Sequence, residues 1–315
     1  MKQPDLPRLP LVVWLFASAL PLGCTSEPAP ERSAAEAAAI CTFEVPATTS
    51  RLIAVEGGLV VAYAAREPGQ LVVERWEGDG CSMHAGPRVA AAALLDADEA
   101  GNLYVFTAET PEPGVRSTVL PERTPGADSS VAKVERSGDV SELVYAGRGI
   151  WSFGIAPAGD ALWVTACGPT GIFEVSEAGM GGAALGAPSS LWQQTPSVLT
   201  DPATFFSLGF PDTGFALTRT TPEGSEALGS TLVDFGDGEE QATLSRCGAG
   251  VCGVYPSGVV VWNDAGEVTF EAALAEVADA GEELVTATAR GDALFLLLRS
   301  AEGARVVRIE TAARD

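Results

Sequence analysis

The stretch FGIAPAGDALWVTACGPTGIFEVSEAG, Phe153–Gly179, contains three short apolar strands separated by two turns. Its runs of apolar and β-branched residues, such as ALWVT, are typical of strands, whereas Gly159-Asp160 is typical of a turn. A unit of this kind cannot bury both faces of its sheet alone. The stretch therefore predicts that its neighbours along the chain repeat the same pattern.

Six stretches of the chain share this order of strands and turns. Their first turns are roughly 36 to 58 residues apart, which is typical of one four-stranded blade of a β-propeller. We therefore predict an all-β fold, a six-bladed β-propeller, with a β-sandwich or two small β domains as the alternative. The six stretches are Leu52–Gly80, Ala92–Asp139, Phe153–Gly179, Phe206–Gly238, Thr243–Gly266 and Thr286–Ala312.

One strand before the first repeat is left over. We expect ICTFEV, residues 40–45, to supply the outer strand of the last blade, because the sixth repeat ends after its third strand. This pairing would close the ring and remove two exposed sheet edges. Residues 270–283, FEAALAEVADAGEE, instead favour a helix where an outer strand is expected.

Three predicted hairpins carry a resemblance to known propellers. DADEAGNLYV (Asp96–Val105), APAGDALWV (Ala156–Val164) and ARGDALFLL (Ala289–Leu297) resemble hairpins of the NHL, streptogramin-lyase and gluconolactonase-like group. The resemblance covers residues 40–315, and it implies the fold rather than an activity. The Gly-His and Trp-Asp signature of WD40 blades is absent from the sequence.

The N-terminal residues 1–24, MKQPDLPRLPLVVWLFASALPLGC, have the features of a signal peptide. A weakly basic start precedes a mainly apolar run of 14 residues, Leu9–Leu22, which is too short to span a bilayer comfortably. The ending LPLGC resembles the bacterial lipoprotein signal, which implies removal of residues 1–23 and attachment of lipid, including palmitate, to Cys24. The alternative is ordinary cleavage after Ala17-Ser18-Ala19, which would leave Cys24 as a thiol.

Residues 24–39 have the composition of a disordered tether, rich in Ala, Glu, Pro and Ser and without an aromatic residue. We therefore divide the chain into a signal peptide (1–23), a lipidated cysteine with its tether (24–39) and a β-propeller domain (40–315). Thr25 follows Cys24 where an aspartate would resemble an inner-membrane retention signal. This favours the outer membrane of a Gram-negative bacterium, with a secreted or periplasmic protein as the alternative.

The charge balance restricts the partners. The chain has 42 acidic and 19 basic residues, a net charge of −23, whereas nucleic-acid binding needs clustered Lys and Arg. We expect no nucleic-acid partner. The expected partners are the membrane, reached through the lipid on Cys24, and an envelope protein or a small-molecule ligand.

The cysteines predict disulfides, because an extracytoplasmic compartment is oxidising. Cys247 and Cys252 flank a predicted hairpin turn and so come within bridging range. A metal site there would need two more ligands, which a chain with one histidine does not readily offer. Cys41 and Cys81 form the second expected pair, which leaves Cys167 unpaired.

No catalytic, cofactor-binding or metal-binding residue is predicted. His84 is the only histidine and could act as a general base, but the Gly and Ser residues around it favour a solvated loop. Two acidic turns could bind calcium through carboxylate oxygens, although solvated turns are the favoured interpretation. Their residues are Asp96 and Asp98, and Asp234, Asp237, Glu239 and Glu240.

Two functions fit these features. The first is a lipid-anchored binding or scaffold module without a cofactor, which binds through loops at the rim, including the Pro-rich residues 110–130. The alternative is a metal-dependent lactonase- or lyase-like enzyme. The two differ in the lining of the ring centre. The enzyme needs three or more Asp, Glu or Asn oxygens within reach of a metal, whereas an apolar or arginine-lined centre opposes it.

Overall fold

A computed structural model describes 14 segments of the chain, all within one unit, Glu36–Asp315. The expected signal peptide, Cys24, most of the loop 110–130 and the acidic turn 234–240 lie outside these segments. None of the helices in the described segments is long and apolar enough to cross a membrane. The segments are 39–66, 70–78, 81–98, 100–107, 116–117, 129–146, 152–158, 161–167, 170–176, 179–185, 197–201, 204–209, 216–229 and 242–311.

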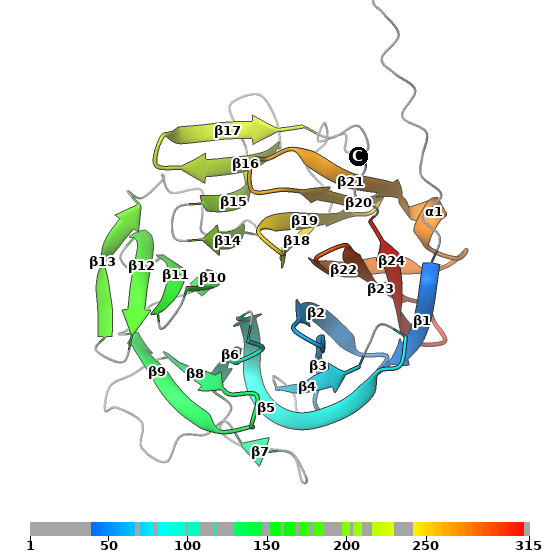
Figure 1. Ribbon diagram of the computed structural model, residues 1–315, viewed down its shortest axis with the longest axis horizontal. Helices are drawn as coiled ribbons and strands as arrows, with labels where there is room; N and C mark the ends of the chain where they lie inside the picture. Colours follow the sequence, from blue (N-terminus) through cyan, green and yellow to red (C-terminus); the bar gives the residue numbers. More distant parts are fainter. Residues whose placement is uncertain are drawn as a thin grey trace, which may run out of the picture. The chain divides into compact units, whose positions relative to one another are not determined.

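Four of the sheets have four strands each and are antiparallel throughout (Figure 1). Three of them are built from consecutive strands. These are β10 (Ser152–Ala158), β11 (Ala161–Cys167), β12 (Thr170–Ser176) and β13 (Gly179–Leu185); β14 (Ser197–Asp201), β15 (Thr204–Gly209), β16 (Ala216–Thr221) and β17 (Gly224–Leu228); and β18 (Thr243–Cys247), β19 (Gly250–Tyr255), β20 (Gly258–Trp262) and β21 (Val268–Ala273).

The last four-stranded sheet combines the two ends of the domain. It has the order β1–β24–β23–β22, in which β1 (Ala39–Val45) pairs antiparallel with β24 (Ala304–Glu310) and places Phe43 opposite Val306. Its other strands are β22 (Glu283–Arg290) and β23 (Ala293–Arg299). The expected pairing of the N-terminal strand with the last sheet is thus confirmed.

The fifth sheet corrects the predicted number of blades. It has eight strands: β2 (Thr49–Val55), β3 (Gly58–Ala64), β4 (Leu71–Glu77), β5 (His84–Ala97), β6 (Leu103–Thr107), β7 (Arg116–Ser117), β8 (Ser129–Val134) and β9 (Val140–Ala146). The 14-residue β5 pairs with β4 and then with β6, so that Ala91 lies opposite both Leu71 and Thr107. The described chain therefore forms five blades, and the prediction of six was wrong.

The reason for this difference lies in the sequence of β5. No glycine or proline follows Pro87 within the strand, and its remainder, RVAAAALLDA, is almost entirely apolar. With no turn residue to end the strand, the stretch that follows the first predicted repeat and the start of the second repeat become one continuous strand. The predicted repeats, which end at Gly80 and begin again at Ala92, placed a boundary between two blades within this strand.

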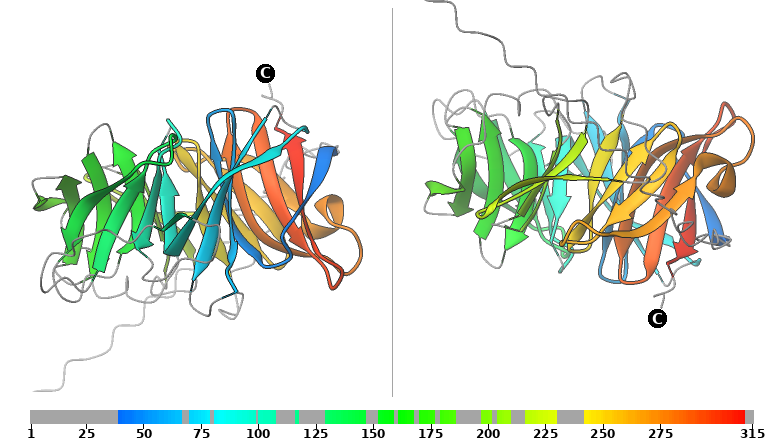
Figure 2. Two further views of the ribbon diagram at one scale, coloured as in Figure 1. Left: turned by 90° about the horizontal axis from the view of Figure 1, so that it is seen from below. Right: turned by 90° about the horizontal axis from the view of Figure 1, so that it is seen from above.

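The sheets form a ring, as expected for a propeller and not for a β-sandwich (Figure 1). Around the centre, β2 contacts β22, β22 contacts β18 and β18 contacts β14; β14 contacts β10, β10 contacts β5, and β5 returns to β2. In the two side views of Figure 2 the strands run roughly between the two rims of this ring. The turns between strands therefore lie at the rims.

The core lies between neighbouring sheets. Leu294, Leu296 and Leu298 of β23 pack in a cluster with residues of β19 and β20, while Phe295 and Leu297 pack in another cluster with β2 and β3. Because both faces of β23 are covered, its sequence ALFLLL is an unbroken apolar run rather than an alternating one. The propeller arrangement thus explains the high content of apolar strand residues.

The segment 270–283 combines both expected structures. Phe270 to Ala273 complete β21, the outer strand, and a single helical turn follows as α1 (Leu274–Val277). The Glu276 carboxylate accepts a hydrogen bond from Ala273 N at 2.8 Å, which caps this turn. The predicted helix is therefore only four residues long and does not replace the outer strand.

Candidate functional site at the ring centre

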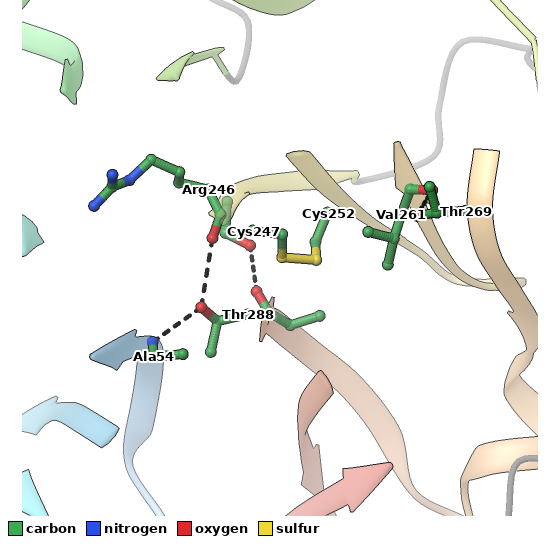
Figure 3. Close-up of a disulfide and its surroundings, with 9 residues drawn as sticks. Ala54, Arg246, Cys247, Cys252, Val261, Thr269 and Thr288 are labelled. Carbon is green, nitrogen blue, oxygen red and sulfur yellow. Dashed lines mark hydrogen bonds between the residues drawn. A yellow bond between two sulfur atoms is a disulfide. The ribbon is translucent and has the colours of Figure 1, made fainter. Parts of the chain in front are cut away.

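Three inner strands are tied together near the ring centre by the side chain of Thr288. Its hydroxyl oxygen on β22 accepts a hydrogen bond from Ala54 N of β2 at 3.0 Å and donates one to Arg246 O of β18 at 3.4 Å (Figure 3). Ser245 Oγ also donates to Ala287 O, which joins β18 to β22 a second time. These bonds fix the strand ends that surround the centre.

The side chain of Arg246 extends from β18 in the direction opposite to the neighbouring disulfide (Figure 3) and reaches Asp96 of β5, an inner strand of another sheet. Its Nε lies 3.0 Å from Asp96 Oδ2, and its Nη2 lies 3.3 Å from Asp96 Oδ1. Nη2 also donates to Ala97 O. The side chain of Arg246 is 18% exposed and that of Asp96 only 6%, so the pair is largely shielded from water.

A second arginine joins this pair. Arg51 of β2 donates from Nη1 to Leu94 O of β5 at 2.6 Å, and it is close enough to interact electrostatically with both Asp96 and Arg246. We call Arg51, Asp96 and Arg246 the axial cluster. It joins β2, β5 and β18, which belong to two different sheets.

The charged groups of the axial cluster act on one another's pKa values. Burial raises the pKa of Asp96 above its ordinary value, while Arg246, Arg51 and the N–H of Ala97 act in the opposite direction. Burial lowers the pKa of Arg51, but a guanidinium stays protonated at neutral pH. The Asp96 carboxylate at the ring centre thus interacts with two guanidinium groups, through an ion pair with Arg246 and through the charge of Arg51.

Asp98, two residues after Asp96, stabilises the turn between β5 and β6. Its carboxylate accepts hydrogen bonds from Asn102 N and Nδ2, both at 2.7 Å, and from the Tyr104 hydroxyl at 3.2 Å. Burial, followed by the charge of Asp98, raises the pKa of Tyr104. The favoured interpretation of Asp96 and Asp98 as a solvated acidic turn was therefore wrong for Asp96, which is buried and paired with arginine.

The other expected residues lie away from the axial cluster or outside the description. His84 is exposed at the start of β5, so it lies on a strand rather than in a loop. Cys167 ends β11, and its side chain is not among those described. Asp234, Asp237, Glu239, Glu240 and Cys24 lie outside the described residues. Within the described segments, no group of three His, Cys, Asp or Glu residues could hold a metal ion.

Both expected disulfides are present in the structure. Cys41 of β1 is bonded to Cys81, which follows β4, with their Cα atoms 5.4 Å apart. Cys247 and Cys252 are bonded across the β18–β19 turn, with their Cα atoms 5.6 Å apart. The second disulfide directly follows Arg246 in the chain and fixes the end of the strand that carries it.

The fold is a β-propeller. No family model matches the chain, and no curated protein matches it. Many solved structures are similar, and the three described here each have a TM-score below 0.5. YCF48 bound to D1 peptide has 9% identity and a TM-score of 0.48, covering 87% of this chain and 96% of that one.

The other two structures are of different kinds. The WD40 β-propeller domain of Doa1 has 10% identity and a TM-score of 0.45, covering 85% of this chain and 95% of that one. A Mycobacterium tuberculosis puromycin-hydrolysing peptidase has 15% identity and a TM-score of 0.39, covering 83% of this chain and 43% of that one. The narrower resemblance to the NHL-like group stays a prediction.

The sequence interpretation missed both arginines of the axial cluster. Arg246 is 150 residues from Asp96, so no local spacing relates them. The available signal is weak: each arginine lies within a strand that is otherwise apolar or small, as in TSRLIAV and TLSRC. A charged residue in such a strand faces solvent, a partner or the centre of the fold, and the sequence does not distinguish these.

Proposed function

We propose that the protein is a lipid-anchored, extracytoplasmic β-propeller that acts as a binding module, with the axial cluster at the centre of its binding surface. The observation that carries this proposal is the engagement of Asp96 by two arginines. Because the Asp96 carboxylate is paired with Arg246, it is not free to bind the metal ion that a metal-dependent lactonase would need there. The binding function is therefore preferred to the enzymatic one.

Four turns near the axial cluster and Thr288 form the proposed binding rim. Asp96 and Arg246 each lie one residue before the last residue of their inner strand, close to the β5–β6 and β18–β19 turns. Ala54 lies one residue before the end of β2 and Thr288 two residues before the end of β22, close to the β2–β3 and β22–β23 turns, and these two residues are hydrogen-bonded to each other. These four turns therefore lie on one rim, which we call the cluster rim.

Two features support the proposed location outside the cytoplasm. Residues 1–24 resemble a lipoprotein signal, and two disulfides are the usual consequence of folding in an oxidising compartment. The lipid on Cys24 would hold the propeller at a membrane. The proposed membrane is the outer membrane of a Gram-negative bacterium. An envelope protein or a small molecule is the proposed ligand.

Photocrosslinking of the full chain in its native envelope tests the binding function. A photoreactive residue replaces Asp292, exposed on the β22–β23 turn of the cluster rim, or Glu302, exposed on the turn between β23 and β24 at the opposite end of the same sheet. We expect a reproducible crosslinked partner from position 292 and none from position 302. Equal crosslinking from both positions, or metal-dependent lactone hydrolysis by the purified chain, would contradict the proposal.

A further inference from the structure

The two disulfides differ in how accessible they are to solvent. Cys81, which follows β4, is exposed, and Cys41 in β1 is partly buried. Cys247 and Cys252 are both buried, with exposed fractions of 7% and 0%. A thiol that attacks a disulfide must reach one of its two sulfur atoms. The Cys41–Cys81 disulfide is therefore the one that a thiol can reach without opening the fold.

The Cys41–Cys81 disulfide joins the first and the last sheet of the ring. Cys41 lies on β1, the outer strand of the last sheet, opposite Arg308 of β24. Cys81 follows β4, which belongs to the eight-stranded sheet. Cys247 and Cys252 instead lie on neighbouring strands of one sheet. Of these two disulfides, the exposed one is the bond that crosses between sheets.

The strands joined by this disulfide also hold two turns of the cluster rim. Thr311, directly after β24, donates from its N to Asp292 O of the β22–β23 turn at 2.7 Å. Gly78, directly after β4, donates from its N to Gly57 O of the β2–β3 turn at 3.1 Å. The disulfide thus connects β4 with β1, the strand paired to β24, near the ends that hold these turns.

We propose that the Cys41–Cys81 disulfide is a thiol-exchange site whose reduction weakens partner binding at the cluster rim, which rests on the binding function proposed above. The reductant is a protein with a pair of cysteine thiols. One of its thiolates attacks Cys81 Sγ, and the bond to Cys41 breaks, so that Cys41 leaves as a thiolate and takes up a proton. The second thiolate then attacks the mixed disulfide. Cys81 leaves as a thiolate and is protonated, the reductant becomes a disulfide, and two electrons have passed to the cysteine pair.

The junction between the two sheets keeps its packing when this bond is broken. The rings of Phe43 of β1 and Trp76 of β4 have centroids 5.7 Å apart, and Leu59 of β3 packs in one cluster with Phe295 and Leu297 of β23. Reduction therefore loosens the junction without unfolding the ring. Turns that are less firmly held lose more conformational freedom on binding, which lowers the affinity for a partner.

Timed reduction of the folded full chain tests the exchange site. Reduced thioredoxin serves as the dithiol protein, and iodoacetamide blocks the released thiols, which peptide mass spectrometry then locates. We expect Cys41 and Cys81 to be released at least about tenfold faster than Cys247 and Cys252, because the buried pair must wait for local opening of its sheet. Equal rates, faster release of the buried pair, or no release without denaturant would overturn the exchange site.

Photocrosslinking from position 292 tests the effect on binding. The yield of crosslinked partner should fall several-fold when the exposed disulfide is reduced and should recover on reoxidation. The double variant Cys41→Ser/Cys81→Ser is the matched control: it should give the low yield without reductant and no further decrease with it. If this variant does not fold, the oxidised, reduced and reoxidised samples of the unmodified chain decide alone.

Amide hydrogen exchange separates loosening of the junction from general unfolding. Protection of β15, in a sheet that contains none of the four bonded cysteines' sheets' connections to β1 or β4, should not change on reduction. Loss of this protection would show that the disulfide only stabilises the fold and would overturn its control of binding.

The outcomes separate this inference from the proposed function. If the oxidised and the reduced chain give the same crosslinking yield, the binding function stands and its control by the disulfide is overturned. If position 292 gives no partner in the oxidised chain, the proposed function and its control both fail, whereas the timed reduction still decides the exchange site.

Discussion

At the scale of single residues, the hydroxyl group of Thr288 connects inner strands at the ring centre. Thr288 is 1% exposed and connects Ala54 N to Arg246 O, so its hydroxyl group joins three inner strands. A buried group that loses its hydrogen-bond partner costs about 1–3 kcal/mol. The stability of the centre therefore depends on a residue that has no charge and no local sequence signature.

We predict that Thr288→Val lowers the free energy of unfolding by about 1–3 kcal/mol, because valine keeps the shape but leaves Ala54 N without its partner. Urea unfolding measures the change. Thr243→Val is the control: Thr243 also bonds from β18 to β22, through Val285 O, but is exposed, and its loss should cost less than about 0.5 kcal/mol. Equal losses in the two variants would contradict the role given to Thr288.

Arg305 and Glu282 give the fold a dependence on pH. Arg305 of β24 donates to Glu282 at 2.6 Å and to Asp279 at 2.8 Å, and the bond from Arg305 lowers the pKa of Glu282. A lowered pKa in the folded state adds stability above the unfolded value, about 4.3, and this stability is lost as the pH falls through the folded value.

We predict that Glu282→Gln destabilises the protein by about 1 kcal/mol at neutral pH, a value kept small because the pair is partly exposed. The difference from the unmodified chain should shrink as the pH falls below about 4.3 and should disappear once the pH is below the lowered pKa of Glu282 in the folded state. Urea unfolding curves of the variant and of the unmodified chain, recorded between neutral pH and this acidic range, measure the difference in the free energy of unfolding. Glu283→Gln, whose side chain is 65% exposed, is the control and should show almost no difference at any pH.

At the scale of elements, β5 determines how the first two sequence repeats behave. Residues 84–91 of β5 pair with β4, and residues 91–97 pair with β6. The strands on either side of β5 therefore belong to one sheet of eight strands. Apolar residues of both halves, including Val73 and Val105, pack in one cluster. The two repeats should therefore open together rather than as separate blades.

We predict that amide protons in β3 and β6 exchange with the same free energy of opening, because both strands depend on β5. Hydrogen exchange followed by mass spectrometry measures this directly. The control strand is β15, which belongs to a separate four-stranded sheet. Its amide protons can exchange with a different free energy of opening. Complete exchange of β6 while β3 stays protected would show that β5 does not unite the two repeats.

The strands and hairpins could be predicted from the sequence because their signals are local. Turn glycines such as Gly101 and Gly291 adopt positive φ, which explains why they mark turns in the chain. The continuity of β5 depends on the absence of a turn residue, which repeat counting does not register. The axial cluster depends on contacts between residues about 150 positions apart, for which the sequence has no local signal.

At the scale of the whole molecule, the acidic balance of the chain bears on how it can attach to a membrane. A net charge of −23 repels anionic surfaces, so membrane attachment would depend on lipid rather than on charge. The Arg246–Asp96 pair at the ring centre is largely shielded from water, so salt screens it less than it screens the charges on the surface.

We predict that the native protein begins at Cys24 and carries diacyl or triacyl lipid on that residue. Mass spectrometry of the N-terminal fragment from native membranes measures this mass. Cys24→Ser is the control, and it should abolish lipid attachment and release the chain from the membrane. An unmodified fragment that starts at Leu20 would contradict lipidation.

The central claim, that the protein binds a partner through the cluster rim, is tested most directly by photocrosslinking of the full chain in its native envelope. A photoreactive residue at position 292, on the β22–β23 turn of the cluster rim, should give a reproducible crosslinked partner. The same residue at position 302, on the turn between β23 and β24, should give none. Equal crosslinking from the two positions, or no partner from position 292, would contradict the claim.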